Sequence, residues 1–472
     1  IGQLIPQNID RRILPNDIAR LSVELPVVKD CRDEDYVVME VNKAMLELRR
    51  NGGGPVHINL ITTYSRDFSV KELPHVKVMR RFQAWDELPV LPEGRIGIYV
   101  GSHTHFSEKQ NRAIDRFCAT YDAVVICDHT SGYYGKYKLL PTLVQLQSDI
   151  TSPFPPLDLM VHIGEISAAS FNDTIPAKEV WRVSEDGELR DPFKKLTTVF
   201  QMSEEMFFLH YGKDGCNRHV LIDECRELFG EIYEQIPELP FCNIWTAMQL
   251  SSRLPKGALF HMGVSNTRRC WNMFQLPESV ESACNVGCCG IDGCVSTLVG
   301  ASLVNPDRLC YVVVGDLTFF YDLNSLGNHH IGTNLRVMLV NNGRGTEFRL
   351  GIHHCNVFGD DADKYMAAAG HFGNKSPLLV KHYAEDLGFH YLSATTKEEF
   401  MTALSNFTNP QLSDHSMILE VFTDSKDESE ALYLMSHIQS DAKGMVRSKL
   451  KDAVRNVAGE KGINAIKKIL KK

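Results

Sequence analysis

Short apolar runs alternate with amphipathic segments along most of the chain. In the first half, the segments that predict buried strands lie at 95–101, 122–128 and 156–165, with a predicted helix at 107–121. In the second half, comparable apolar runs lie at 257–266, 309–316, 335–342 and 415–424. Strands that alternate with helices favour parallel sheets covered by helices on both faces. The pattern therefore predicts an α/β protein with parallel sheets flanked by helices.

Polar stretches divide this alternating pattern into units. A helix is predicted at 33–50, and a Gly/Pro turn with a short strand follows at 51–60. A proline-punctuated stretch at 69–94 has the character of a linker, and a second polar region lies at about 205–235. We therefore predict the following division: the end of an incomplete first domain plus linker at 1–85, complete α/β domains at 86–235 and 236–430, and a tail at 431–472.

Composition narrows the class of protein. The 472 residues are 43% hydrophobic and 23% charged, as in soluble globular proteins, and roughly three domains are expected for this length. The net charge of −9 argues against non-specific nucleic-acid binding. No apolar run approaches the ~20 residues of a membrane span, and no secretory signal is recognised. Thirteen cysteines without a framework spacing indicate reduced thiols and a cytoplasmic location.

The last segment, 441–472, differs in composition from the rest. It carries ten Lys and Arg against three Asp and Glu, with apolar residues at helical spacing. Such a basic amphipathic tail could contact an anionic membrane surface or a protein partner. The alternative is a solvated helix packed on its own protein.

Two polar side chains stand directly after two of the predicted buried strands. Asp316 follows the apolar run 309–315, and Asn342 follows the run 335–340. Parallel sheets bind ligands beyond the carboxyl ends of their strands, so both side chains are expected at one edge of the sheet. Carboxylate, amide and carbonyl oxygens are the ligands that Mg²⁺ takes together with phosphate groups. The placement predicts one divalent metal and, through it, a diphosphate.

The residues next to Asp316 are candidates for contacts with the same diphosphate. Gly315 would let the turn come close, and the backbone amides of Leu317 and Thr318, with the Thr318 hydroxyl, would contact phosphate oxygens. The alternative for each residue alone is structural, because aspartates that cap helices and asparagines in turns are frequent. The joint placement after two buried strands favours the metal site.

These motifs resemble those of the thiamine diphosphate-dependent enzymes. Gly-Asp at 315–316 is followed by Asn-Asn at 341–342 about as in that family, and the form "GDLTFFYDLN" is similar to that of the menaquinone-pathway 2-succinyl-5-enolpyruvyl-6-hydroxy-3-cyclohexene-1-carboxylate synthase. The block "NVGCCGIDGCVSTLVG" at 285–300 resembles the family's Gly-Ile-Asp-Gly stretch, and "GPVHINL" at 54–60 resembles the last strand of its pyrimidine-binding domain. The resemblance covers about residues 1–430.

The resemblance implies a three-domain fold whose first, pyrimidine-binding domain is incomplete in this sequence. It implies thiamine diphosphate and Mg²⁺ as cofactors and a homodimer or tetramer, because the family grips its cofactor between two subunits. The implied reaction is decarboxylation of a 2-oxo acid and transfer of the acyl-anion equivalent to an acceptor. Two alternatives stay open: a non-catalytic relative that keeps the fold for assembly or partner binding, and a simple 2-oxo acid decarboxylase.

Carried over position by position, the resemblance gives roles to further residues. The matches to the metal ligands are Asp316, Asn342 and the backbone carbonyl of Arg344. Ile291, next to Gly290, matches the apolar residue that props the cofactor into a bent shape, and the carbonyl of Cys289 would accept from its 4′-amino group. The other positions expected beside the cofactor are Ser265, Asn266 and Phe348.

Several positions depart from the family pattern. The family's activating glutamate lies in a part of the first domain that this sequence does not contain. The sequence could begin inside a larger polypeptide, a separate polypeptide could supply that part, or the protein could have lost catalysis. Val286 and Trp271 stand at positions where the family has arginines, while Arg268 and Arg269 are offset. Valine cannot replace a bidentate carboxylate clamp. The substrate is therefore expected to differ.

Two residues after the Asn-Asn pair are candidates for proton transfer. Glu347 falls where the family has an apolar residue; it could act as a general acid or base, or it could pair with Arg344 or Arg349. His353 follows the same loop and could relay protons near a reacting carbonyl. A nearby group of thiols lacks the spacing of a zinc ribbon and is interpreted as buried cysteines: Cys284, Cys288, Cys289 and Cys294.

Overall fold

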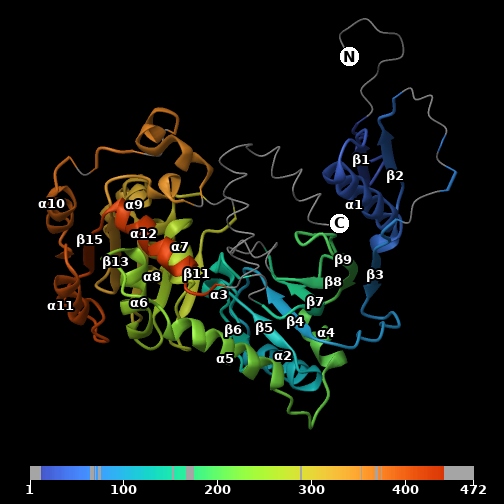
Figure 1. Ribbon diagram of the computed structural model, residues 1–472, viewed down its shortest axis with the longest axis horizontal. Helices are drawn as coiled ribbons and strands as arrows, with labels where there is room; N and C mark the ends of the chain where they lie inside the picture. The colour runs from blue at the N-terminus through green and yellow to red at the C-terminus, as the bar shows by residue number, and fades with distance from the viewer. Residues whose placement is uncertain are drawn as a thin grey trace, which may run out of the picture.

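Three units follow one another along the chain. The computed structural model describes residues 12–63, 69, 71–72, 76–150, 154–165, 175–287, 290–351, 353–366, 370–373 and 375–440. Figure 1 shows a small N-terminal unit in blue, a middle unit in cyan and green, and a C-terminal unit in yellow to red. The predicted tail at 441–472 lies outside the described residues. Within them, no helix combines the length and the apolar character that a membrane crossing requires.

The N-terminal unit is a two-stranded parallel sheet with one helix. Its elements are β1 (Leu21–Leu25), α1 (Cys31–Glu47) and β2 (Val56–Leu60). The helix begins at Asp30, whose side chain accepts hydrogen bonds from the amides of Arg32 and Asp33. Its buried core is small and contains Val23, Leu25 and Ala44.

The middle unit is built on a seven-stranded parallel sheet of order β3-β9-β8-β7-β4-β5-β6. Its strands are β3 (Arg80–Gln83), β4 (Ile96–Val100), β5 (Val124–Ile126), β6 (Lys138–Leu139), β7 (Leu157–Ile163), β8 (Ala177–Val183) and β9 (Leu196–Gln201). Its helices are α2 (Glu108–Tyr121), α3 (Thr142–Leu146), α4 (Glu204–Tyr211) and α5 (Val220–Glu234). β4 is buried at every position, as expected for a central strand covered on both faces.

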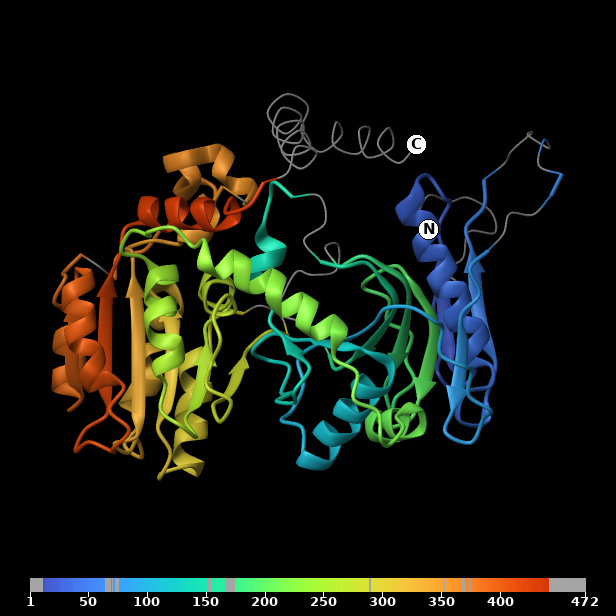
Figure 2. The same ribbon diagram turned by 60° about the horizontal axis from the view of Figure 1, so that its bottom comes forward.

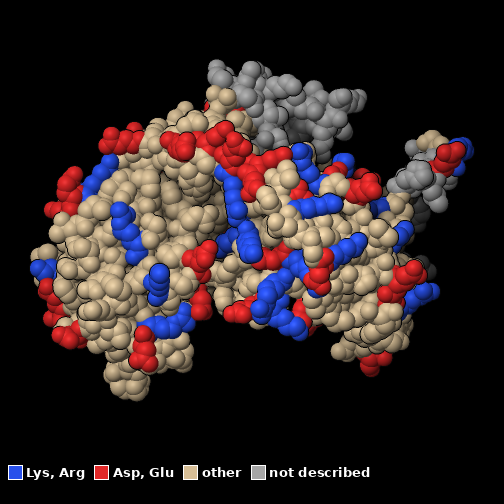
Figure 3. Space-filling view, turned by 90° about the horizontal axis from the view of Figure 1, so that it is seen from below, with Lys and Arg blue, Asp and Glu red and all other residues tan. Residues whose placement is uncertain are grey.

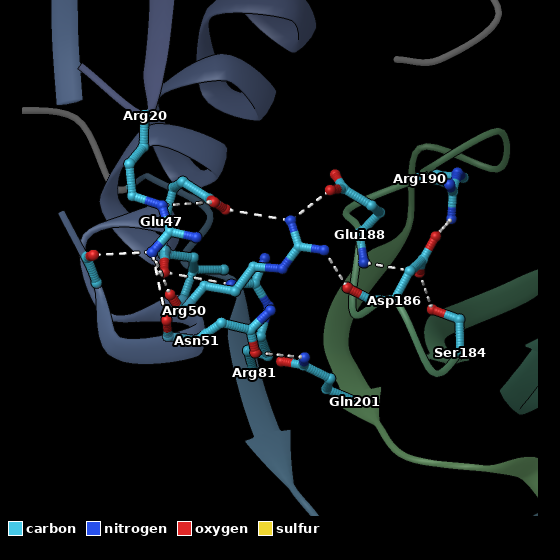
Figure 4. Close-up of polar contacts among 12 residues, drawn as sticks. Arg20, Glu47, Arg50, Asn51, Arg81, Ser184, Asp186, Glu188, Arg190 and Gln201 are labelled. Carbon is cyan, nitrogen blue, oxygen red and sulfur yellow. Dashed lines mark hydrogen bonds and ion pairs between the residues drawn. The ribbon is translucent and has the colours of Figure 1, made fainter. Parts of the chain in front are cut away.

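A polar network joins the N-terminal unit to the middle unit (Figure 4). Arg50 Nη1 lies 3.4 Å from Glu47 in its own unit and also pairs with Glu188, in the loop between β8 and β9. The same guanidinium donates to the backbone carbonyl of Asp186. Arg50 thus contacts both the end of α1 and the loop between β8 and β9.

The C-terminal unit is built on a six-stranded parallel sheet of order β11-β10-β12-β13-β15-β14. Its strands are β10 (Leu259–Met262), β11 (Glu281–Cys284), β12 (Cys310–Gly315), β13 (Leu335–Asn341), β14 (His390–Ala394) and β15 (Met417–Phe422). Its α-helices are α6 (Asn243–Leu250), α7 (Asn266–Trp271), α8 (Cys294–Val304), α9 (Asp316–Asp322), α10 (Leu379–Asp386), α11 (Lys397–Phe407) and α12 (Ser425–Ser436). Two 3₁₀ segments follow β13: η5 (Thr346–Arg349) and η6 (His354–Lys364).

Successive residues of the central strands point to opposite faces of this sheet. Val313 and Met338 belong to one hydrophobic cluster, whereas Val312 and Val337 belong to a second cluster with residues of α8, α9 and α10. Figure 2 shows helices on both sides of the sheet. The prediction of an α/β protein with parallel sheets flanked by helices is therefore confirmed.

Elements of the structure cross two of the predicted boundaries, and helices occupy the predicted polar region. β3 lies inside the stretch 69–94 and pairs with β9, so the middle sheet begins before the expected boundary at residue 85. The polar region at 205–235 contains α4 and α5, because residues such as Phe208 and Ile232 are buried within an otherwise polar sequence. α12 extends beyond residue 430 and buries Met435, so the tail begins later than predicted.

The middle and C-terminal units share one continuous hydrophobic cluster. Beside it, Gln147 joins the end of α12 to the middle unit. Its Nε2 donates to the carbonyl of Met435 at 2.8 Å, and its Oε1 accepts from the amides of Ile438 and Gln439 at 3.0 and 3.2 Å. Both apolar packing and polar contacts thus connect the two large units.

Candidate functional site

β12 and β13 are neighbours and bring Asp316 and Asn342 to one edge of the C-terminal sheet. Their parallel register pairs Gly315 with Val340, so the two chains leave the sheet side by side. Asp316 is the first residue of α9 and is 3% exposed. Asn342 directly follows β13. This placement agrees with the strand-end arrangement expected from the sequence.

Two acceptor atoms at this edge form no hydrogen bond with the described residues, although one of them, Asp316 Oδ2, lies 3.0 Å from His371 Nε2. Asp316 Oδ2 and Asn342 Oδ1 are buried, and neither has a hydrogen-bond partner among the described residues. Since buried polar atoms nearly always have partners, the two oxygens favour a bound cation. A carboxylate oxygen and an amide oxygen are ligands that Mg²⁺ accepts. The residues present therefore fit the expected ion.

Acidic and imidazole side chains alone do not complete such a coordination shell. The described residues contain no group of three or more His, Cys, Asp and Glu side chains that could hold a metal. A cation at Asp316 and Asn342 would need backbone, water or ligand oxygens in addition. That is the usual situation for Mg²⁺ bound together with phosphates.

Arg344, predicted to supply one such backbone oxygen, follows in the same turn. Its carbonyl accepts a hydrogen bond from the amide of Thr346 at 2.9 Å. A carbonyl oxygen has two lone pairs, so this hydrogen bond does not by itself prevent a metal contact. The role of Arg344 as a third ligand stays a prediction.

A buried network fixes the turn that carries these groups. Asn341 Nδ2 donates to Glu420 Oε1 at 2.7 Å, and the Tyr391 hydroxyl donates to Glu420 Oε2 at 2.7 Å. Asn341 Oδ1 in turn accepts from the amide of Gly343 at 3.2 Å. Glu420 is 1% exposed, and burial raises its pKa. This acid was not identified from the sequence, although a lone glutamate inside the apolar strand "MILEVF" was a usable signal.

His371 is a second neighbour that sequence reasoning missed. Its Nε2 lies 3.0 Å from Asp316 Oδ2, but neither atom forms a hydrogen bond. The ring packs near Phe320, with 5.2 Å between centroids. The adjacent Gly370 pairs with Arg344 in an isolated bridge. Because a long-range contact brings this histidine to the strand end, no local sequence signal could have found it.

The residues expected to contact phosphate differ in how open their surroundings are and in whether their groups are already hydrogen-bonded. A Cβ at Gly315 would meet no protein atom within 4 Å, so the space beside it is open. Thr318 is buried in α9. The amide of Leu317, however, donates to Asp316 Oδ1 at 2.8 Å. In this structure that amide binds its neighbouring side chain, and a phosphate contact would require the bond to break.

The turn after β10 contains Ser265 and Asn266. Ser265 has φ 60° and ψ −120°, a conformation that is costly for a residue with a side chain and that occurs preferentially at functional turns. Asn266 Oδ1 accepts from Arg269 Nη1 at 3.4 Å and lies 3.6 Å from Cys270 Sγ. The Asn266 side chain therefore contacts its own helix, and its predicted contact with a cofactor remains a prediction.

Arg269 on α7 and Glu347 in η5 form a two-pronged ion pair. The distances are 3.0 Å from Nη1 to Oε2 and 2.7 Å from Nη2 to Oε1. Burial opposes the charge of Arg269, but the hydrogen bond with Glu347 raises its pKa overall. The sequence offered Arg344 or Arg349 as alternative partners of Glu347; the structure pairs Glu347 with Arg269, and Arg349 pairs with Asp363. The pair connects the turn after β10 to the loop after β13.

His353 and Phe348 lie together in that loop. His353 Nδ1 accepts a hydrogen bond from the amide of Cys355 at 3.1 Å, which caps η6 and leaves the proton of a neutral ring on Nε2. The ring meets Phe348 edge to face, with 5.2 Å between centroids. The predicted roles of His353 in proton transfer and of Phe348 beside the cofactor stay predictions.

The stretch between β11 and α8 contains the other expected cofactor contacts. Ile291 and Gly290 lie just before α8, while Cys289 and Cys288 fall outside the described residues. Val286 is 7% exposed and therefore closed off from a ligand in solution. The expected contacts of Ile291 and Cys289 with a cofactor remain predictions.

Trp271, the residue at the second arginine position, belongs to the core. It is 0% exposed, and its Nε1 donates to Asn243 Oδ1 at 3.2 Å. The backbone amide of Asn243 donates to Glu428 Oε1 at 2.9 Å. Burial raises the pKa of Glu428 to about 7, although hydrogen bonds from Asn243 and Thr423 oppose this change. Neither Val286 nor Trp271 can supply the positive charge of an arginine.

No protein-family model matches the chain. It is 28% identical over 460 residues to the 2-succinyl-5-enolpyruvyl-6-hydroxy-3-cyclohexene-1-carboxylate synthase of Bacteroides thetaiotaomicron, covering 92% of this chain and 79% of that protein. A synthase of the same name from Phocaeicola vulgatus is 28% identical over 466 residues, with 92% and 78% covered. A shorter match, to the synthase of Christiangramia forsetii, is 33% identical over 199 residues and covers 42% and 33%.

The two long matches cover the N-terminal, middle and C-terminal units together, and their printed name is that of the synthase whose motifs the strand ends resemble. The chain is similar, over most of its length, to the 2-succinyl-5-enolpyruvyl-6-hydroxy-3-cyclohexene-1-carboxylate synthases.

Proposed function

We propose that this protein is a thiamine diphosphate- and Mg²⁺-dependent carboligase. It would decarboxylate a 2-oxo acid and join the resulting acyl-anion equivalent to an acceptor. The observation that carries the proposal is the pair of buried oxygens, Asp316 Oδ2 and Asn342 Oδ1, which form no hydrogen bond with the described residues and follow adjacent strands. The names of the relatives, which are synthases of a cyclohexene carboxylate, support the same class of reaction.

The protein would contribute binding and geometry. When bound, the cofactor supplies the carbanion centre and the electron sink. Asp316, Asn342 and the carbonyl of Arg344 would hold the metal, and the open space beside Gly315 would admit a phosphate. Ile291 would offer an apolar surface to the two rings of the cofactor. Because these groups lie on the ends of buried strands and on adjoining turns, they would be held in place before the cofactor binds.

The substrate would differ from that of the menaquinone-pathway synthases. The two positions at which those enzymes are expected to have arginines hold Val286 and Trp271, and both are buried. Arg269 lies close by, but Glu347 already occupies its guanidinium. We therefore propose a substrate that lacks the carboxylates bound by the missing arginines. Analysis of products with and without an added acceptor would separate a ligase from a simple decarboxylase.

A homodimer or tetramer is part of the proposal, since the family's cofactor is held between subunits. Sedimentation equilibrium with and without thiamine diphosphate and Mg²⁺ measures this directly. The expected result is a dimer or tetramer that the cofactor stabilises.

Calorimetric titration with thiamine diphosphate tests the proposal. Affinity in the wild type should depend on Mg²⁺, and it should collapse in Asp316→Ala. Asp361→Ala is the matched control, because Asp361 is exposed and forms a surface ion pair with Lys364 at 2.8 Å. Equal binding by wild type and Asp316→Ala, or equal loss in both variants, would refute the assignment.

A further inference from the structure

A cleft between the middle and C-terminal units gathers cationic side chains away from the candidate cofactor site. It has a volume of about 390 Å³ and is lined by residues of β6, α5 and the segment that leads into β11. Its charged lining residues are Lys136, Lys138, Arg226 and Glu278. Figure 3 shows Lys and Arg side chains gathered where the two large lobes meet. Three cationic side chains and one carboxylate make the lining of this cleft positive, whereas the whole chain has a net charge of −9.

The three cations have no acidic partner among the described residues, in contrast to the many paired lysines and arginines elsewhere. Lys138 lies with its ammonium 4.9 Å from the centroid of the Tyr134 ring. Burial lowers the pKa of Lys138, while Asp128 and Glu278 favour its charged form from a distance. Asp128 is itself engaged by the amide and hydroxyl of Thr130, at 2.6 and 2.5 Å. The ammonium therefore rests on an aromatic face without a carboxylate in contact.

Arg226 is held in position for a ligand. Its Nη2 donates to the carbonyl of Lys136 at 2.6 Å, which orients the guanidinium and leaves its other N–H groups available. A planar guanidinium binds carboxylate or phosphate oxygens with two parallel hydrogen bonds. Arg226 and Lys138 thus present two different cationic donors to one cleft.

Apolar and aromatic side chains also line the cleft. The residues that form this wall are Phe229, Tyr233, Leu276, Pro277 and Val280. Both units contribute to it, and the Tyr134 hydroxyl donates to the carbonyl of Val280 at 3.1 Å across the junction. Ligand sites commonly combine an apolar wall with a few placed polar groups and occur between domains.

We propose that this cleft binds a small phosphate monoester that carries an apolar or aromatic group. Lys136, Lys138 and Arg226 would contact the phosphate, and the group would pack against Phe229 and Tyr233. A phosphate monoester carries a charge of about −1.5 to −2 at neutral pH, which matches three cations and one carboxylate. The ligand would also contact the segment entering β11, the strand that leads toward Gly290 and Ile291. The site is separate from Asp316 and Asn342 and does not depend on the function proposed for them.

Phenyl phosphate is a suitable probe, titrated calorimetrically into the full chain in the presence of saturating thiamine diphosphate and Mg²⁺. Under these conditions the predicted diphosphate site is occupied and cannot capture the probe. The wild type should bind with saturation, and Lys138→Met should weaken binding at least tenfold while keeping the apolar contact with Tyr134. Arg226→Lys keeps the positive charge but loses the planar guanidinium that can form two parallel hydrogen bonds. A smaller loss of affinity than in Lys138→Met is therefore expected.

Lys256→Met is the matched control, because it removes the same charge from an exposed lysine that lines a different hollow. Binding should be unchanged in this variant. Thermal unfolding of each variant without probe shows whether the variant folds. If Lys138→Met does not fold, Arg226→Lys still tests the proposal. The proposal is overturned if the wild type shows no saturable binding or if Lys256→Met loses as much affinity as Lys138→Met. It is also overturned if inorganic phosphate binds as tightly as phenyl phosphate, since the apolar wall would then contribute nothing.

Discussion

At the scale of single residues, the ion pair of Arg269 and Glu347 shows how the candidate site accommodates a largely buried charge. Removing one partner of a buried pair leaves an uncompensated charge and typically costs about 3–5 kcal/mol, whereas replacing both by apolar groups can be neutral. The side chains of Arg269 and Glu347 are 20% and 23% exposed, so partial solvent access reduces this cost. The pair should therefore behave as a strongly coupled unit.

Glu347→Leu is accordingly expected to lower the free energy of unfolding by about 2–3 kcal/mol. The double variant Arg269→Met/Glu347→Leu should recover most of that loss, because no unpaired charge remains. Urea unfolding of the wild type, both single variants and the double variant measures the coupling. Additive losses in the double variant would show that the two side chains are not coupled. Loss of activity in a stable double variant would support the predicted proton-transfer role of Glu347.

Glu428 is a second residue whose charge state matters. Its pKa in the folded protein is about 7, because burial outweighs the hydrogen bonds from Asn243 and Thr423. In the unfolded chain the pKa returns to its ordinary value of 4.5. Between these values the folded state binds more protons than the unfolded state, so the stability contributed by this group falls as the pH rises from 4.5 to 7.

Glu428→Gln should remove this pH dependence. Between pH 4.5 and pH 8 the wild type should lose about 3 kcal/mol of unfolding free energy relative to the variant, since each pKa unit corresponds to about 1.4 kcal/mol. Other titrating groups are common to both proteins and cancel in the difference. Unfolding by urea at several pH values provides the measurement. Parallel stability curves for the two proteins would mean that Glu428 titrates normally.

At the scale of elements, the turn after β13 depends on a residue of the neighbouring strand β15. Glu420 accepts from both Asn341 and Tyr391, and Asn341 in turn accepts from the amide of Gly343. Removing the carboxylate would leave the Asn341 amide group and the Tyr391 hydroxyl without their acceptor. The turn that presents Asn342 and Arg344 should then lose its fixed geometry.

Glu420→Met is therefore expected to weaken Mg²⁺-dependent binding of thiamine diphosphate at least tenfold, if the proposed function holds. Tyr391→Phe is the control, because it removes the hydroxyl but leaves the bond between Asn341 and Glu420. Its effect should be several-fold smaller. Calorimetry gives the affinities. Thermal unfolding without cofactor shows whether a variant that binds weakly is still folded, so that a change in the turn alone can be told from global unfolding. Equal effects of the two substitutions would contradict the role assigned to Asn341.

The elements that could be predicted best from the sequence are those with a clear pattern in their own residues. β12 is a uniform apolar run, and β13 is apolar apart from Arg336 and its final Asn341. A polar residue directly follows each strand, so their pattern alone placed Asp316 and Asn342. β8 was not predicted because charges interrupt it; one of these, Arg182, is 1% exposed and donates to the carbonyl of Gly164 at 3.1 Å. His371 reaches Asp316 through pairing of Gly370 with Arg344, a contact that depends on the folded chain. Contacts between distant segments therefore account for most of what the sequence could not reveal.

At the scale of the whole molecule, the question is whether the middle and C-terminal units unfold together. One hydrophobic cluster runs through both sheets. Apolar burial is the dominant favourable term in folding, so a shared cluster should make the two units cooperative. Gln147 adds polar contacts with Met435, Ile438 and Gln439 at the end of α12.

Gln147→Leu separates these two contributions. The substitution removes the Gln147 partner of two carbonyls, those of Leu143 and Met435, and of two backbone amides, each worth about 1–3 kcal/mol if it stays buried. Hydrogen exchange at Ile438 and Gln439 should therefore accelerate at least tenfold, while exchange in β12 and β13 keeps its order of protection. Gln235→Leu is the control, because its Nε2 donates only to the carbonyl of Glu231 on the exposed side of α5.

The shared cluster is untouched by Gln147→Leu, so unfolding by urea should remain a single transition with a lower midpoint. If apolar packing connects the units, losing the polar contacts frees only the end of α12. If the units were instead joined mainly by Gln147, the variant would unfold in two steps, with the middle sheet and the C-terminal sheet losing protection at different urea concentrations. The number of transitions thus decides whether the two large units form one cooperative body through their core or two bodies connected by a buried glutamine.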